Sequence, residues 1–222
     1  MSKLRLNITM SLDGYVAGRN QSVKNPLGEG GEQLHEWALA TRTFRAIHGM
    51  EGGATGTDDE IAKEYFHNVG ATIMGRHMFG GGDGPWGDEP WNGWWGDDPP
   101  FRMPVFVLTH HAREPLEMQG GTTFHFVTEG IHAALRHAKA AAQDKDITLG
   151  GGANVAQQYL NRGLIDELDI HVVPILLGAG ARLFDNTEGR QSDYECVRVI
   201  ASPAVGHYKY RLKSEPDQPI NR

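Results

Sequence analysis

Two short apolar runs in this sequence end in glycine and lead directly into a helical pattern. The first is ITLGGGANVAQQYL, in which a strand at 147–149 meets three glycines and then a helix at 154–161. The second is ATIMGRHMF, in which a strand at 71–74 meets Gly75. Parallel strands end at the same edge of a sheet, and ligands of α/β proteins bind at that edge. The two junctions therefore predict an α/β fold with a binding site where these strands end.

The rest of the chain alternates between strand-like and helix-like segments. The strands that we expect lie at 4–11, 71–74, 104–109, 123–127, 147–149, 168–173, 196–201 and 207–213. The helices that we expect lie at 33–47, 57–69, 129–142 and 154–161, with Thr57 as the cap of the second. This order predicts a mostly parallel central sheet flanked by helices, with an antiparallel C-terminal edge.

The length of 222 residues predicts a single domain over residues 1–222. Two stretches, 18–56 and 80–103, are rich in glycine and polar residues and are expected to form long irregular insertions. Residues 214–222 are expected to form a tail. Connections of this length are usually functional lids, partner surfaces or disordered segments.

The composition excludes several classes of protein. Hydrophobic residues make up 39% of the chain, which is enough for a core, yet no apolar run approaches the ~18 residues of a membrane span. The net charge of −7, with scattered Lys and Arg, argues against a nucleic-acid partner. The single cysteine, Cys196, is interpreted as a small core residue in a reducing, cytoplasmic setting.

The glycine junctions suit an anionic ligand. Glycines let backbone N–H groups approach a phosphate closely, and a helix N-terminus adds about half a positive charge. Arg76 stands beside Gly75 and is able to pair with such a phosphate. Two plainer interpretations remain open: a tight strand-to-helix turn without a ligand, and a surface arginine.

Five segments together carry a resemblance to a known family. They are NITMSLDGYVAG, ATIMGRHMFGG, PVFVLTHH, ITLGGGANVAQQYL and IDELDIHVVPILLGAGARLF, in this order. The chain resembles the dihydrofolate reductase-like superfamily, and within it the reductase domain of the bifunctional riboflavin-biosynthesis deaminase/reductase. The resemblance spans about residues 3–17 and 57–213. It implies reductase chemistry, NADPH as the cofactor and a homodimer. The zinc-binding motif of the deaminase half is missing, so a role in riboflavin synthesis does not follow.

The resemblance also implies which residues meet the cofactor. Gly75 and Arg76 match the junction that receives its phosphates, with Arg76 as the candidate for the 2′-phosphate or the pyrophosphate. The strand end beside the adenosine half is matched by Thr109 and His110. The turn that cradles the pyrophosphate is matched by Gly151, Gly152, Ala153, Asn154 and Val155. The segment beside the nicotinamide is matched by Met10, Ala17 and Gly18.

Hydride addition to a C=N or C=O bond leaves negative charge, so such a reductase needs a proton source. The resemblance implies an acid near the start of the helix before the Met-Gly-Arg junction. Counting back 16 residues from Gly75 gives Asp59, with Asp58 and Glu60 as neighbours in an ordinary acidic first turn. A second candidate acid is Asp13, unless it only bonds its own turn.

The stretch 80–103 carries four tryptophans within ten residues, Trp86, Trp91, Trp94 and Trp95. They suit three uses: stacking on a flat heterocycle, packing against a dimer partner, or a local cluster. Adjacent histidines such as His110 and His111 point to opposite faces of a strand, so we expect no metal site.

We therefore predict an NADPH-dependent reductase of a small pterin-, pyrimidine- or flavin-like heterocycle. The alternative is a non-catalytic nucleotide- or flavin-binding dimer with the Trp-rich loop as its interaction surface. Dihydrofolate reduction itself is disfavoured, because the segment after Gly18 lacks the Leu-Pro-Trp-like residues of dihydrofolate reductases.

Overall fold

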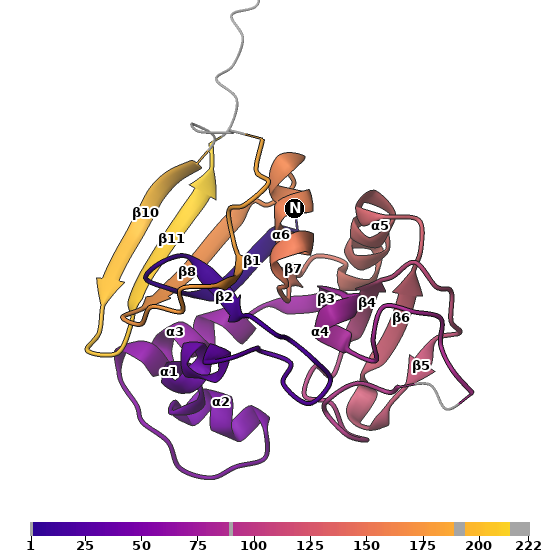
Figure 1. Ribbon diagram of the computed structural model, residues 1–222, viewed down its shortest axis with the longest axis horizontal. Coiled ribbons are helices and arrows are strands. Elements are labelled where there is room, and N and C mark those ends of the chain that lie inside the picture. Colours follow the sequence, from indigo (N-terminus) through magenta and orange to yellow (C-terminus); the bar gives the residue numbers. More distant parts are fainter. Residues whose placement is uncertain (1, 89–90, 189–193, 214–222) are drawn as a thin grey trace, which may run out of the picture.

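The computed structural model describes residues 2–88, 91–188 and 194–213. A nine-stranded sheet runs through this part of the chain, in the order β10-β11-β8-β1-β7-β3-β4-β6-β5 (Figure 1). Its strands are β1 (Leu4–Ser11), β3 (Val69–Gly75), β4 (Pro104–Leu108), β5 (Leu116–Glu117), β6 (Thr123–Val127), β7 (Asp146–Leu149), β8 (Glu167–Val173), β10 (Tyr194–Ala201) and β11 (Gly206–Leu212). The expected tail at 214–222 lies outside the described residues.

The sheet is parallel in its centre and antiparallel at both edges. Strand β1 pairs in parallel with β7 and β8, and the parallel pairing continues through β3, β4 and β6. The hairpin of β10 and β11 joins β8 antiparallel, and the short β5 joins β6 in the same way. The predicted fold class, a mostly parallel sheet with an antiparallel C-terminal edge, is confirmed.

Helices cover both faces of the sheet (Figure 1). One face packs against α5 (Ile131–Ala142) and α6 (Ala153–Asn161), because alternate residues of the strands are apolar there. Leu4, Leu6 and Ile8 of β1 belong to this core. The opposite face lies under α3 (Thr57–Phe66) and is polar: Arg5 of β1 donates to the carbonyls of Glu64 and His67.

The helix expected at 33–47 is broken into three pieces: η1 (Gly31–His35), α1 (Glu36–Leu39) and α2 (Arg42–Ile47). Thr41 separates the last two. Its hydroxyl donates to the carbonyl of Ala38 at 2.7 Å and accepts the N–H of Phe44 at 3.2 Å, so it starts α2 as a cap. The stretch 18–56 is therefore less irregular than its composition suggests.

Two local predictions are wrong. The cap of α3 is Gly56, and Thr57 is the first helical residue. Cys196 is exposed, because it lies on the edge strand β10, one face of which is open. The sequence pattern indicates a short strand at 15–17, and the structure has it as β2 (Tyr15–Gly18). The pattern does not predict η2 (Gln119–Gly121), or the separate two-stranded sheet that β2 forms with β9 (Gly180–Arg182).

Candidate functional site

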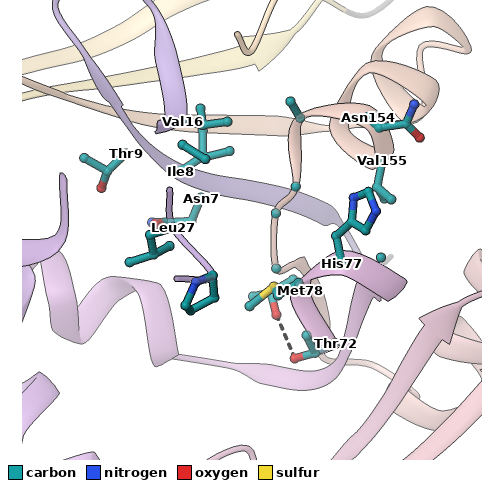
Figure 2. Close-up of a pocket in the computed structure, with 18 of the residues that line it drawn as sticks. Asn7, Ile8, Thr9, Val16, Leu27, Thr72, His77, Met78, Asn154 and Val155 are labelled. Carbon is teal, nitrogen blue, oxygen red and sulfur yellow. Dashed lines mark hydrogen bonds between the residues drawn. The ribbon is translucent and has the colours of Figure 1, made fainter. Parts of the chain in front are cut away.

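A cavity of about 1260 Å³ borders the carboxyl ends of β3, β4 and β7 and one side of β1. Figure 2 shows its wall, with Asn154 and Val155 on one side and Asn7, Thr9 and Leu27 on the other. Pockets for drug-sized ligands usually hold about 300–1,000 Å³. The cavity therefore has room for a dinucleotide together with a small second molecule.

The two glycine junctions lie side by side at the edge of this cavity. Strands β3 and β7 are neighbours, and the N–H of Gly150 donates to the carbonyl of Ile73 at 2.7 Å. A Cβ atom on Gly75 would lie only 2.7 Å from Cγ2 of Val155, so the two turns are in direct contact. Gly151 and Gly152 have φ values of 105° and 89°, which L side chains rarely adopt.

The glycine turn after β7 leads into the N-terminus of α6, which no side chain caps. Gly152, Ala153 and Asn154 all line the cavity. The first N–H groups of a helix have no partner within the helix, and the helix dipole makes this end positive. The turn at 150–154 is therefore suited to an anion.

Arg76 lies at the other junction and begins α4 (Arg76–Phe79). Its guanidinium donates to the carbonyls of Gly82 at 2.7 Å and Gly81 at 3.1 Å, and it stacks over the ring of Trp86, 3.1 Å from the centroid. The remaining Nη1 group is buried and has no hydrogen-bond partner. Burial, together with the charge of Arg113, lowers the pKa of Arg76. Arg76 is thus held rigidly and has one donor left for a ligand.

The Trp-rich loop folds onto its own chain. The indole N–H of Trp91 donates to Phe79 and that of Trp94 to Met78. Trp95 stacks on Phe124. Of the three uses left open, the rings form a local cluster, and Trp94 and Trp95 also line the cavity.

Most of the predicted site residues come together on the cavity wall. These are Ala17, Gly75, Arg76, Thr109, His110, Gly151, Gly152, Ala153, Asn154 and Val155. Four others, Met10, Gly18 and the two candidate acids Asp13 and Asp59, do not line it. Met10 points to the face of β1 that packs on the core, where it borders a smaller apolar groove, and Gly18 packs against the backbone of Glu29.

The two candidate acids hold the fold together and do not line the cavity. Asp59 accepts the N–H of Thr43 at 2.7 Å and pairs with Lys63 at 3.2 Å, which joins α2 to α3. Burial opposes its charge, but these partners keep the pKa of Asp59 below its ordinary value. Asp13 accepts the hydroxyl of Ser11 and the N–H groups of Leu177 and Gly178. A role of either acid as proton donor stays a prediction that this geometry does not favour.

The opposite end of the cavity is formed by residues that the sequence did not single out. Apolar and aromatic side chains dominate it: Leu27, Trp37, Ala38, Phe44, Ile47, Ile61, Ala62, Tyr65 and Phe66. Its polar side chains include Asn7, Thr9, His35 and His48. The signal for Asn7 and Thr9 was available, since they are the polar members of an alternating central strand.

Two kinds of feature are not found in the described residues. No group of three His, Cys, Asp or Glu side chains lies close enough to hold a metal ion. None of the helices in residues 2–88, 91–188 and 194–213 combines the length and apolar character that crossing a bilayer requires.

Residues 2–205 match the model of a protein family described as the RibD C-terminal domain. The chain belongs to the RibD C-terminal domain family. It is also 23% identical to the uncharacterized protein YyaP of Bacillus subtilis (strain 168), over 193 residues that cover 85% of this chain and 83% of YyaP.

Solved structures share the fold of this RibD C-terminal domain. A Shewanella sp. PV-4 protein assigned to riboflavin biosynthesis superposes with a TM-score of 0.61 at 20% identity, covering 96% of this chain and 99% of that one. A TM-score of 0.56 at 14% identity is found for the diaminohydroxyphosphoribosylaminopyrimidine deaminase/5-amino-6-(5-phosphoribosylamino)uracil reductase of Thermotoga maritima. The superposition covers 96% of this chain but only 57% of the Thermotoga protein. Dihydrofolate reductase of Enterococcus faecalis, complexed with NADP(H), gives 0.53 at 12% identity, with 96% and 97% covered.

Proposed function

We propose that the protein is an NADPH-dependent reductase that transfers a hydride to a small pterin-, pyrimidine- or flavin-like heterocycle. Its family and two of its structural neighbours support reductase chemistry, since one neighbour is named a uracil reductase and the other a dihydrofolate reductase with NADP(H). The observation that carries the proposal is the contact between the two glycine turns at the edge of one large cavity.

The residues at this edge fit a dinucleotide. The turn at 150–154 offers uncapped helix N–H groups to a pyrophosphate, and its glycines leave the backbone accessible. The buried Nη1 group of Arg76 is a donor without a partner, which a phosphate oxygen would satisfy. Bound NADPH supplies the hydride, and the chain contributes position: Thr109 and His110 border the same edge from β4.

The end of the cavity near Trp37 suits the substrate. Aromatic and aliphatic side chains there exclude water and offer flat surfaces to a ring. The residues named above for this end include no Lys, Arg, Asp or Glu, so it fits an uncharged ring better than a phosphorylated one. His35 also lines the cavity, and burial lowers the pKa of its imidazole.

Cofactor titration tests the proposal. NADPH is titrated into the protein and followed by its fluorescence, with NADH in parallel. We expect binding well below millimolar concentration, and no binding of either nucleotide would refute the proposal. Arg76→Ala should weaken NADPH more than NADH if its free donor meets the 2′-phosphate, whereas equal losses would remove that role.

Arg113→Ala is the matched control for Arg76→Ala. Arg113 also packs its guanidinium over Trp86, at 4.9 Å, and binds the loop through Trp91 and Asn92. Unlike Arg76, it does not line the cavity. Loosening of the Trp-rich loop would affect both variants alike, so a preference for NADPH that is lost only in Arg76→Ala isolates the phosphate contact.

The homodimer stays a prediction. Sedimentation equilibrium is expected to give twice the monomer mass of 24.4 kDa. A monomer at micromolar concentration would contradict it. The non-catalytic alternative is tested by the same preparation, because it predicts nucleotide binding without oxidation of NADPH by any reducible heterocycle.

A further inference from the structure

A row of polar groups leads from the surface of the molecule to the substrate end of the cavity. Asp58 accepts from Nε2 of His207 at 3.0 Å, and Nδ1 of His207 lies 2.8 Å from Nδ1 of His171. Nε2 of His171 lies 3.2 Å from Oδ1 of Asn7, which lines the cavity. Asp58 is 25% exposed, whereas the two histidines are buried, at 1% and 3% exposed.

The sheet register brings these residues together from distant parts of the sequence. His171 of β8 pairs with Thr9 of β1, two residues beyond Asn7 on the same face, and His207 of β11 pairs with His171. The ring of Trp37 covers both histidines, with centroid distances of 4.7 and 5.0 Å. Both imidazoles are thereby enclosed, and each of their hydrogen bonds has a defined partner.

The bonding pattern fixes where the protons lie. A carbonyl oxygen only accepts, so the contact of Asn7 Oδ1 requires a proton on Nε2 of His171. A neutral His171 then accepts at Nδ1, and His207 must be the donor in the contact between the two rings. His207 also needs a proton between Nε2 and the carboxyl of Asp58. The row therefore holds one proton more than two neutral imidazoles and a carboxylate carry.

We propose that Asn7 reads the polar edge of the substrate ring, and that His171 and His207 are positioning residues that hold its NH2 group toward the cavity as a donor. The proposal rests on the proposed function, because it gives the substrate end of the reductase its recognition group. It assigns the substrate to the uncharged flat rings that carry a carbonyl acceptor. The neighbouring Thr9 hydroxyl oxygen accepts the indole N–H of Trp37 at 3.1 Å.

Loss of the extra proton reverses the direction of the hydrogen bonds that run from His207 through His171 to Asn7. A neutral His207 keeps its proton on Nε2, where it faces the carboxylate of Asp58, so its Nδ1 becomes an acceptor. His171 must then carry its own proton on Nδ1, and its Nε2 becomes an acceptor. The amide of Asn7 turns over to donate, and its carbonyl oxygen faces the cavity. The site thus prefers a carbonyl-bearing ring at low pH and an amine-bearing ring at high pH.

The charged side chains around the two histidines lie on α3 and β10. The carboxylate of Asp58 on α3 favours the added proton. Arg198 on β10, which pairs with Glu64 of α3, opposes positive charge on the histidines. Burial and the neighbouring charges of His207 and Arg198 lower the pKa of His171 to about 3. Both ring nitrogens of His207 make contacts that need a proton, one to His171 and one to Asp58, so this geometry places the added proton between His207 and Asp58.

Two small neutral probes test the proposal on the wild-type protein. 1,3-Dimethyluracil carries carbonyl acceptors and no N–H group, whereas aniline carries an amine donor. Their dissociation constants are measured by ligand-observed NMR in the presence of NADPH, at pH values below and above the ordinary histidine pKa of about 6.5. We expect the preference for dimethyluracil over aniline to fall about tenfold as the pH rises, the usual effect of replacing a matched hydrogen bond by a mismatched one.

Three variants separate recognition from packing. Asn7→Leu should abolish the pH dependence and weaken dimethyluracil about tenfold at the lower pH, with aniline little changed. His207→Gln should leave the preference independent of pH. Thr9→Val is the control: it breaks the bond to Trp37 beside the same histidines and should keep the wild-type pH dependence.

The outcomes are distinguishable. A preference that does not change with pH in the wild type, or that changes equally in Asn7→Leu, overturns the proposal whether or not the His207 variant folds. Failure of both probes to bind a protein that binds NADPH also overturns it and leaves the reductase proposal intact. Failure of NADPH itself to bind refutes the proposed function.

Discussion

The contact between the two glycine turns predicts a specific effect of Gly75→Ala. The backbone of Gly75 is extended, with φ at −84°, so alanine brings no conformational strain of its own. The added methyl group would lie 2.7 Å from Cγ2 of Val155, whereas carbon atoms pack at about 3.5–4.0 Å. Strand and helix must separate by about 1 Å to admit it. Overpacking of this kind costs about 1–3 kcal/mol of unfolding free energy.

A second substitution identifies the cause. In Gly75→Ala/Val155→Ala the colliding Cγ2 atom is gone, and the remaining Cβ of residue 155 lies 3.8 Å from the new methyl group, an ordinary contact. Val155→Ala alone should cost about 1–2 kcal/mol for the lost packing. We expect the double variant to be more stable than the sum of the two single losses by about 1–2 kcal/mol. Urea unfolding of the four proteins measures this coupling.

Cofactor binding should follow the same cycle. Separation of β3 from α6 moves the helix N-terminus that we assign to the pyrophosphate, so Gly75→Ala should weaken NADPH about tenfold. The double variant should regain most of this loss. Additive unfolding free energies, or a Gly75→Ala protein that binds NADPH as the wild type does, would show that the two turns do not act as one site.

Three further predictions follow from single contacts. Asp59→Asn should cost about 1–2 kcal/mol in urea, because it weakens the bonds to Thr43 and Lys63, and should leave NADPH affinity unchanged; a selective loss of turnover would instead restore Asp59 as proton donor. Burial lowers the pKa of His171 to about 3 in the folded protein, whereas the unfolded chain takes up a proton near the ordinary pKa of 6.5. Acidification from pH 6.5 toward that pKa should therefore remove about 1.4 kcal/mol of unfolding free energy per pH unit relative to His171→Gln. Equal pH dependence of the unfolding free energy in the two proteins would contradict this. Trp86→Ala should cost about 2–3 kcal/mol and weaken NADPH, because Arg76 loses the ring that orients it; unchanged affinity would argue against that support.

The sequence predicted those strands whose pattern of apolar residues lies within a single short segment. Alternation along 4–11 and the apolar runs before Gly75 and Gly150 predicted strands that the structure contains. Short-range patterns also failed where a single side chain decided the outcome. The hydroxyl of Thr41 ends one helical segment and begins another, although the apolar spacing continues across it.

By itself, the sequence determined that glycine turns follow strands β3 and β7, because a turn needs only its own residues. Only the tertiary structure decided what the side chains of the site do. It brought Asn7 within hydrogen-bond distance of His171, 164 residues away in the sequence. It also placed Asp59 between two helices, where its carboxylate accepts the N–H of Thr43. The physical reason is that a hydrogen bond depends on which groups the packed strands and helices bring within about 3 Å, and the local pattern does not contain that information.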